Sequence, residues 1–310
     1  MTQQVKTSIS QPKNRLAQSH FALIYLNMFS TFNLKNIRHE LVLLESAIEK
    51  HGPKVELSKY DETFIAKSVQ HRMRETFCKA FDEYFTLIGK SLDETKRFIE
   101  SLQISYSEFF RNPLTYSVLE KIVLPMLIQK YTDNKTGGVR IWSSACAKGQ
   151  EPYSLAFLME EILRHRHEKC QYRIFATDQN QMHVNIAQAG KYSPEDMNNL
   201  TLRRISSFFD KQAAVYEVKP ELKKNIDFSV FDLLDEQFSS PPASIFGGFD
   251  LVLCANLLFY YKNAERKKII EKAGNSLSDN GFLVTGETER EILVRYGFKE
   301  VYAHSGIFKK

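Results

Sequence analysis

The spacing of apolar positions divides the chain into a helical first third and an alternating remainder. From residue 37 to about residue 103, apolar side chains recur every three or four positions, which is the repeat of an amphipathic helix. The pattern predicts an all-helical N-terminal domain over residues 36–104, with helices at residues 37–51, 61–76, 80–87 and 92–103. Residues 1–35 are polar at their start and are expected to be an N-terminal extension that is partly disordered.

Two details of these helices can be checked against a structure. Ser91 is expected to cap the fourth helix, with Glu94 three residues later completing a capping box. The second helix is expected to turn four basic side chains outward, namely Lys67, His71, Arg72 and Arg74. Such a face could dock an acidic partner, or it could simply be a solvated surface.

From residue 139 onward, short apolar runs alternate with amphipathic segments, which is typical of a parallel sheet with crossover helices. Residues 105–138 are expected to form a linker and a connecting helix, at 116–131, that Pro125 bends or divides. Strands are predicted at residues 139–142, 172–177, 228–231, 249–254 and 281–285, with a terminal hairpin at 298–309. Helices are predicted at residues 154–165, 182–189 and 264–277.

Residues 193–225 leave this alternation and predict a small inserted β-subdomain, with strand character at residues 206–209 and 214–218. The insertion could be a lid, a peptide-docking edge or an ordinary structural loop. The predicted fold class is therefore α/β: a sheet domain over residues 139–310 that carries this insertion, preceded by the all-helical domain.

Composition narrows the classes of function. The chain has 310 residues and a formal net charge of +5, which is too weak and too scattered to indicate a nucleic-acid partner. The four cysteines show no metal-ligand spacing, so no metal site and a reducing compartment are expected. The apolar run at residues 21–29 is too short to span a bilayer. We expect a cytoplasmic, monomeric protein without membrane insertion.

Residues 139–155 carry the strongest candidate chemistry and read VRIWSSACAKGQEPYSL. A strand that runs into small residues and then into a helix N-terminus is how open α/β sheets hold a nucleotide-like ligand. A single glycine, Gly149, without a following Lys-Ser or Lys-Thr argues against a phosphate-binding loop. Glu151 would repel a pyrophosphate and suits a cationic ligand, such as the amino or sulfonium group of S-adenosylmethionine. An ordinary strand–loop–helix junction without a ligand is the alternative.

Other strand ends offer complementary groups. Asp178 follows the second predicted strand, where an acid can accept two ribose hydroxyls. Asp232 could meet an adenine amino group while Leu233 packs on the ring. The two phenylalanines before Arg111 can anchor that arginine in one direction, so that it can pair with a carboxylate.

Blocks distributed along the chain match a known family in order and spacing. They read FFRNP, WSSACAKGQEPYSLA, ATD, KYS, YEVKPELKK, DLL, FDLVLCANLLFYY and GFLVTGETE. With these blocks, residues 36–310 resemble the CheR-type protein-glutamate O-methyltransferases of bacterial chemotaxis. The resemblance implies a class I, Rossmann-like methyltransferase that uses S-adenosylmethionine and releases S-adenosylhomocysteine. It also implies that the acceptors are glutamate side chains on chemoreceptor cytoplasmic helices.

The resemblance also implies roles for particular residues. The implied cofactor-binding residues are Ser107, Arg111, Ala145, Glu151, Asp178, Asp232, Leu233, Asn256 and Leu257. The implied catalytic residues are Arg111, which comes from the linker, and Tyr260, which would sit near the transferred methyl group. Ser107 stands where the family usually has a threonine, so the hydroxyl is kept.

Three positions depart from the family pattern. Ala255 replaces a common arginine near the active site, Gln150 replaces the first acid of Gly-Glu-Glu-Pro, and Asp232 replaces a common asparagine. The loss of the arginine removes a positive charge where an acidic acceptor would arrive. It keeps two alternatives open: a cofactor-binding signalling protein with weak or no turnover, and a methyltransferase with a different acceptor.

Overall fold

The computed structural model describes the chain except for residues 1–36, 51–54, 104–105, 135–136, 246–247 and 310. It divides into two compact units. Of the described residues, the first comprises those from 37 to 58 and Glu62–Phe98, and the second comprises Lys59–Asp61 and those from 99 to 309. The expected N-terminal extension lies outside the described residues. Among the residues that are described, no helix has both the length and the apolar character needed to cross a membrane.

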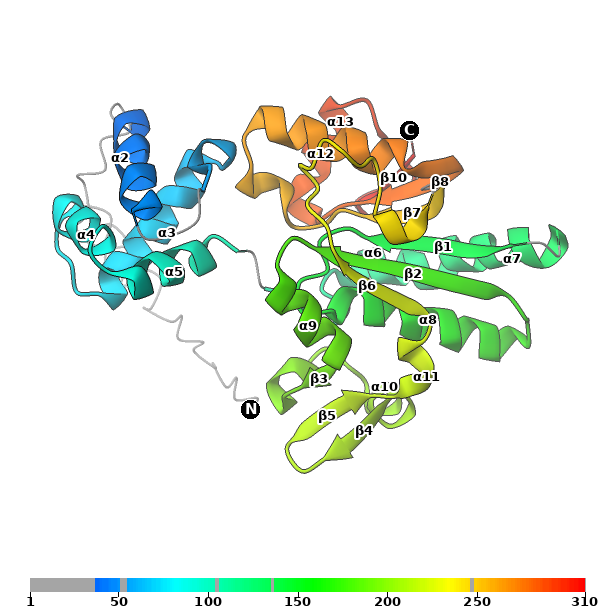
Figure 1. Cartoon of the computed structure of the whole chain (residues 1–310). Coiled ribbons are helices and arrows are strands. Elements are labelled where there is room, and N and C mark those ends of the chain that lie inside the picture. Colours follow the sequence, from blue (N-terminus) through cyan, green and yellow to red (C-terminus); the bar gives the residue numbers. More distant parts are fainter. Residues whose placement is uncertain (1–36, 51–54, 104–105, 135–136, 246–247, 310) are drawn as a thin grey trace, which may run out of the picture. The chain divides into compact units, whose positions relative to one another are not determined.

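The first unit contains the predicted helices (Figure 1). They are α2 (Ile37–Glu49), α3 (Glu62–Glu75), α4 (Phe81–Ile88) and the greater part of α5 (Leu92–Ser101). Side chains at helical spacing fill the core of the unit, including Leu44, Ile48, Ile65, Val69 and Phe98, each at most 2% exposed. The apolar pattern therefore predicted the helices and their buried faces correctly.

One local expectation in this unit was wrong, and a second is confirmed only in part. Arg72 does not point outward: its guanidinium donates to both carboxylate oxygens of Glu94 at 2.9 and 2.7 Å, and its side chain is 12% exposed. Ser91 Oγ accepts the Glu94 N–H at 3.2 Å, which is half of the expected capping box. The Glu94 carboxylate is directed away from that box because it also accepts the Tyr84 hydroxyl at 2.9 Å. A pattern read along one helix cannot show a partner on another helix.

The second unit is built on a seven-stranded sheet in the order β6-β2-β1-β7-β8-β10-β9 (Figure 1). The first five of these strands run parallel, and β10 is antiparallel to both β8 and β9. The strands are β1 (Gly138–Ser143), β2 (Gln171–Asp178), β6 (Ile226–Val230), β7 (Phe249–Leu253), β8 (Leu277–Val284), β9 (Lys299–Glu300) and β10 (Ile307–Lys309). The predicted α/β class and terminal hairpin are confirmed.

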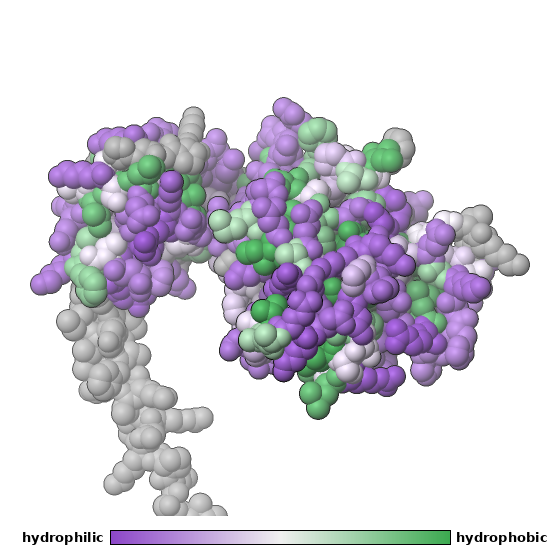
Figure 2. Space-filling view, turned by 60° about the horizontal axis from the view of Figure 1, so that its bottom comes forward, coloured by the Kyte–Doolittle hydropathy of each residue, from purple (hydrophilic) through white to green (hydrophobic). Residues whose placement is uncertain are grey.

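Crossover segments follow the strands. They include α8 (Gln150–Arg166), α9 (Gln181–Ala189), α12 (Asn263–Asn275) and α13 (Arg290–Arg295). Successive residues of β1 point to opposite sides, since Ile141 belongs to one apolar cluster, with residues of α8, and Trp142 to another, with residues of α12. Figure 2 shows that one face of the molecule is mostly hydrophilic, with small and separate apolar patches.

The connecting helix begins earlier than predicted, at Pro113, and is divided by a π-helical turn. It consists of α6 (Pro113–Val118), the π-helical turn Leu119–Val123 and α7 (Leu124–Asn134). Pro125 lacks an N–H and its ring conflicts with the carbonyl four residues back, so a wider turn just before it accommodates the proline within one continuous helix. The helix packs in the apolar core of the second unit.

The insertion forms a separate three-stranded antiparallel sheet in the order β3-β5-β4. Its strands are β3 (Lys191–Tyr192), β4 (Phe209–Gln212) and β5 (Val215–Val218), with α10 (Leu202–Phe208) and α11 (Pro220–Lys223) beside them. The expected strand character at residues 206–208 was wrong, because these residues end α10. Thr201 caps that helix by accepting the Arg204 N–H, a signal that precedes the apolar run.

Candidate active site

The turn between β1 and α8 brings the backbone close to the space above the sheet. Ala147 and Gly149 have φ angles of 46° and 93°, in the left-handed region that favours glycine. A Cβ at Gly149 would lie 2.8 Å from the Cβ of Ala187, so the turn also needs a residue without a side chain. The Cys146 N–H donates to the Thr177 carbonyl at 2.8 Å and holds the turn against β2.

Glu151 lies in the first turn of α8, with its carboxylate at the pocket. The Ser143 hydroxyl donates to Oε1 at 2.7 Å. Burial raises the pKa of Glu151 to about 7, although the Ser143 hydrogen bond and the Arg111 charge oppose the rise; the charge of Glu289 adds to it. A carboxyl group whose ionisation is disfavoured by burial gains most from a cationic ligand.

Asp178 ends β2 and is 7% exposed. Its Oδ2 accepts the Ala147 N–H at 2.9 Å, while Oδ1 accepts the Asn180 N–H at 2.9 Å and lies 3.3 Å from His183 Nδ1. The carboxylate thus fastens the β1–α8 turn to the end of β2 while it lines the pocket. The sequence predicted an acid at this position, but not its hydrogen bond to the backbone of the β1–α8 turn.

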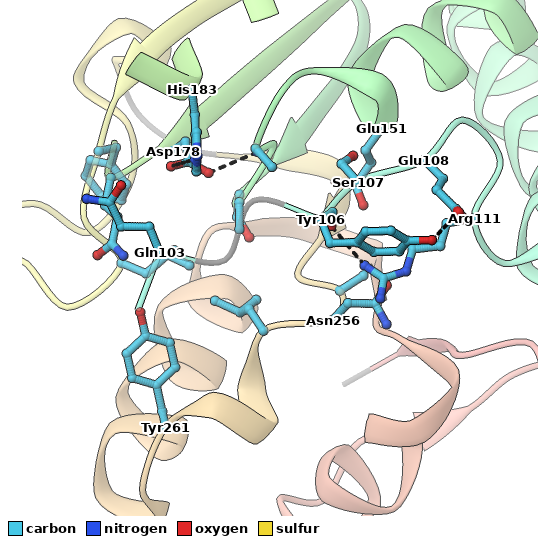
Figure 3. Close-up of a pocket in the computed structure, with 18 of the residues that line it drawn as sticks. Gln103, Tyr106, Ser107, Glu108, Arg111, Glu151, Asp178, His183, Asn256 and Tyr261 are labelled. Carbon is cyan, nitrogen blue, oxygen red and sulfur yellow. Dashed lines mark hydrogen bonds and ion pairs between the residues drawn. The ribbon is translucent and has the colours of Figure 1, made fainter. Parts of the chain in front are cut away.

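Arg111 is placed by the aromatic residues around it. Phe109 and Phe110 are 0% and 7% exposed, which confirms the expected anchoring. The guanidinium carbon lies 4.9 Å from the centre of the Tyr106 ring, and Nη1 donates to the Tyr106 carbonyl at 3.2 Å. Figure 3 shows the side chain beside Tyr106 and turned toward Asn256.

A buried acid that sequence reasoning did not single out organises the loop after β7. Glu289 is 0% exposed and accepts the N–H groups of Asn256 and Leu258, both at 2.6 Å. It also accepts the Gly286 N–H and the Thr285 hydroxyl, both at 3.0 Å. Asn256 has a φ of 62°, and these bonds hold it in that conformation. The GETE sequence was the available signal, because an acid three residues after a glycine can cap its turn.

These elements line one pocket, whose empty space is about 850 Å³ with the open mouth included. All nine residues expected to bind cofactor line it: Ser107, Arg111, Ala145, Glu151, Asp178, Asp232, Leu233, Asn256 and Leu257. Residues that sequence reasoning missed also line it, among them Tyr106, Ser144, Gln179, His183, Phe231 and Tyr261. Several of these follow a predicted strand or lie in the small-residue turn, which was the signal available.

Tyr260, the other expected catalytic residue, is outside the pocket lining, and its neighbour Tyr261 lines the pocket instead. Burial raises the pKa of the Tyr260 phenol, while the positive charge of Arg111 lowers it. The Tyr260 phenol is therefore close enough to Arg111 for an electrostatic interaction. The part of the chain that the structure describes contains no cluster of histidine, cysteine or acidic side chains suited to a metal.

The donor set fits S-adenosylmethionine. Glu151, in the first turn of α8, can face a cationic group, and Asp178, at the end of β2, can accept hydrogen bonds from a ribose. The buried Leu233 offers an apolar surface for a base. In Figure 3, Asp178, His183, Gln103 and Tyr261 lie on one side of the pocket, and Glu151, Ser107 and Arg111 lie on the other. The pocket can therefore separate a nucleoside end from an amino-acid end.

Comparison with known proteins agrees with this geometry. Residues 105–304 match the family model described as CheR methyltransferase, SAM binding domain. A chemotaxis protein methyltransferase of Listeria innocua is 32% identical over 236 residues, covering 76% of this chain and 84% of that protein. Proteins with the same description from Borreliella burgdorferi and Escherichia coli are 27% and 25% identical, covering 76% and 75% of this chain and 82% and 78% of their own length.

The architecture and pocket define a class I methyltransferase. The chain belongs to the CheR methyltransferase family, and its cofactor is S-adenosylmethionine. The family, the enzyme class and the cofactor expected from the sequence are confirmed.

Proposed function

We propose that this protein transfers a methyl group from S-adenosylmethionine to glutamate side chains on cytoplasmic helices of chemoreceptors, in chemotaxis adaptation. The relatives that cover most of the chain are described as chemotaxis protein methyltransferases, which supports this role. The observation that carries the proposal is the convergence of Arg111, Glu151 and Asn256 on one pocket. The protein acts as a cytoplasmic monomer and binds neither nucleic acid nor membrane.

The chemistry needs little beyond alignment. S-adenosylmethionine supplies an electrophilic methyl group on a positively charged sulfur. A glutamate carboxylate is ionised at neutral pH, so the acceptor needs no base. A carboxylate oxygen forms the new bond to the methyl carbon as the carbon–sulfur bond breaks, and sulfur keeps the electron pair. The positive charge of the sulfonium and the negative charge of the carboxylate are both lost in this step. Transfer of the two groups from water into the pocket therefore favours the reaction.

Side chains of the pocket would supply the alignment. Glu151 binds the cofactor amino group, Asp178 accepts the ribose hydroxyls, and Asp232 with Leu233 borders the adenine. Ser107, Ala145 and Leu257 complete the cofactor contacts. Arg111 orients the carboxylate that approaches, and Tyr260, which lies outside the pocket lining, contributes only through its proximity to Arg111. In-line placement of this kind supplies most of the rate gain in a displacement that needs no acid or base.

The test is incubation with S-adenosylmethionine that carries a radiolabelled methyl group, together with purified receptor cytoplasmic fragments. Methyl esters hydrolyse in mild alkali, so the label should be released as methanol. A fragment whose acceptor glutamates are replaced by alanine is the matched control and should stay unlabelled. Label that survives alkali would contradict the ester and indicate another acceptor.

Ala255 supports a second candidate, a cofactor-binding signalling protein with weak turnover. Ala255 lines the pocket, where the family commonly has an arginine. Under this candidate, S-adenosylhomocysteine binds normally while receptor fragments remain unlabelled. The variant Ala255→Arg would then restore labelling, because it returns a cation to the place where the acceptor carboxylate arrives. Efficient labelling by the unmodified protein rejects this candidate.

A further inference from the structure

A three-residue segment from the N-terminal third of the chain belongs to the methyltransferase unit. Lys59–Asp61 groups with residues 99–310, although the residues on both sides of it belong to the helical unit. The Asp61 N–H donates to the Tyr260 carbonyl at 2.8 Å, and the Lys262 N–H donates to the Lys59 carbonyl at 2.9 Å. These bonds form a short antiparallel bridge between Tyr60 and Tyr261. The Asp61 carboxylate also lies 3.8 Å from the Arg266 guanidinium.

The Tyr60 side chain reaches residues of the cofactor pocket. Its ring stacks on Tyr261, with ring centres 5.3 Å apart and planes 22° from parallel. Burial raises the pKa of the Tyr60 phenol, and the nearby carboxylate of Asp232 raises it further. The Gln179 side chain lies near the Tyr60 hydroxyl, where hydrogen bonding lowers the pKa of the phenol. Tyr261, Gln179 and Asp232 all line the pocket. Tyr60 therefore interacts with three residues of the pocket wall, by ring stacking, hydrogen bonding and electrostatics respectively.

These three residues share one side of the pocket. Gln179 directly follows Asp178 at the end of β2, and Asp232 follows β6, the next strand in the sheet. Tyr261 lies on the same side as Asp178 in Figure 3, away from Glu151 and Arg111. This is the side where the ribose and the base would lie, because the ends of parallel strands carry the nucleoside in open α/β folds.

We propose that Tyr60 is a positioning residue for the nucleoside half of the cofactor: it fixes Gln179 and Tyr261 as a wall, and the bound nucleoside in turn fixes Lys59–Asp61. Cofactor occupancy then restrains the chain at both ends of this segment, where it leads into the helical unit. The inference rests on the family's cofactor and not on the identity of the methyl acceptor.

Binding measurements with two probes test the proposal. S-adenosylhomocysteine carries both halves of the cofactor, whereas 5′-methylthioadenosine carries the nucleoside half alone. Tyr60→Phe should weaken both probes equally, by about fivefold for one lost hydrogen bond, and Tyr60→Ala should weaken both further. Glu151→Gln should weaken S-adenosylhomocysteine only. The matched control is Tyr296→Phe, which removes a tyrosine hydrogen bond to the Asn263 carbonyl, at a residue outside the pocket lining.

Hydrogen exchange tests the second half of the proposal on the full chain. S-adenosylhomocysteine should slow exchange at the Asp61 and Lys262 amides of the unmodified protein, and it should do so much less in Tyr60→Ala at saturating ligand. Unchanged dissociation constants for both probes in Tyr60→Phe and Tyr60→Ala would overturn the inference, as would a loss confined to S-adenosylhomocysteine. None of these measurements uses a methyl acceptor, so failure of the receptor assignment would leave them unaffected.

Discussion

Glu289 is the residue whose removal should damage the site most without touching the ligand. Its carboxylate accepts hydrogen bonds from the Asn256, Leu258 and Gly286 N–H groups and from the Thr285 hydroxyl. The replacement Glu289→Gln keeps the shape but puts an amide nitrogen in place of one oxygen. That nitrogen is a donor, and it must face at least one group that also donates.

The bonds determine which orientation costs less. Oε2 accepts three donors and Oε1 accepts one, so the amide will place its oxygen at the Oε2 position and its nitrogen against the Leu258 N–H. One buried donor then loses its partner, which costs about 1–3 kcal/mol of unfolding free energy. Because that N–H belongs to the loop that carries Asn256 and Leu257, binding of S-adenosylhomocysteine should weaken about tenfold or more.

Urea unfolding followed by tryptophan fluorescence suits this test. The chain has one tryptophan, Trp142, which is buried in β1 and therefore reports on the methyltransferase unit. The matched control is Glu287→Gln, an exposed acid in the same turn, which should change neither stability nor binding. If Glu289→Gln unfolds at the same urea concentration as the control and binds S-adenosylhomocysteine equally well, the loop does not depend on this carboxylate and the reasoning fails.

Three further predictions concern other parts of the pocket. Burial raises the pKa of Glu151 to about 7, above its ordinary 4.5, so this group's contribution to stability is complete below pH 4.5 and is lost as the pH rises through about 7. Urea unfolding should show the unmodified protein losing stability relative to Glu151→Gln across that range. Calorimetry should show the affinity of the unmodified protein for S-adenosylhomocysteine rising over the same range, because the cationic amino group favours the ionised carboxylate. Parallel pH profiles of the unmodified protein and Glu151→Gln would contradict this. Gly149→Ala should destabilise the fold by about 1 kcal/mol or more and abolish ligand binding, because of its left-handed φ and the close Cβ of Ala187, whereas Gly297→Ala, with a similar φ of 85° and open space, should affect stability alone. Arg111→Ala should abolish methyl transfer with unfolding unchanged, and transfer at the normal rate by a folded variant would remove Arg111 from catalysis.

The sequence predicted the sheet well because parallel strands are buried on both faces and therefore appear as continuous apolar runs. It placed the ends of strands less well. β8 begins at Leu277, four residues before the predicted strand, and passes through Ser-Asp-Asn-Gly, which resembles a turn. Pairing with β7 decides this start, since Leu277 is in register with Phe249 and the register shifts before Leu251. Such an irregularity depends on the neighbouring strand and leaves no periodic signal.

The candidate site likewise contains some residues that the sequence could place and others that it could not. Asp178, Asp232 and Asn256 each follow a recognisable strand, and strand ends of a parallel sheet meet at one edge, so the sequence could bring them together. Tyr60, by contrast, is more than 100 residues from Gln179 and lies between two helical segments. Its position depends on a backbone bridge to Tyr261 that no local pattern predicts. Glu289 was visible only as part of a family resemblance.

Two buried carboxylates explain why this pocket can be formed before its ligand arrives. Asp178 holds the turn after β1 by the Ala147 N–H, and Glu289 holds the loop after β7 by the Asn256 N–H. Both loops are thereby fixed to the sheet by charge-assisted bonds, which are stronger than neutral ones and leave little to reorganise on binding. Arg111 differs, because its hydrogen bond to the Tyr106 carbonyl is exposed to water. The two loops are therefore held in place before the cofactor binds, whereas the water-exposed hydrogen bond of Arg111 can be exchanged for one to an acceptor carboxylate.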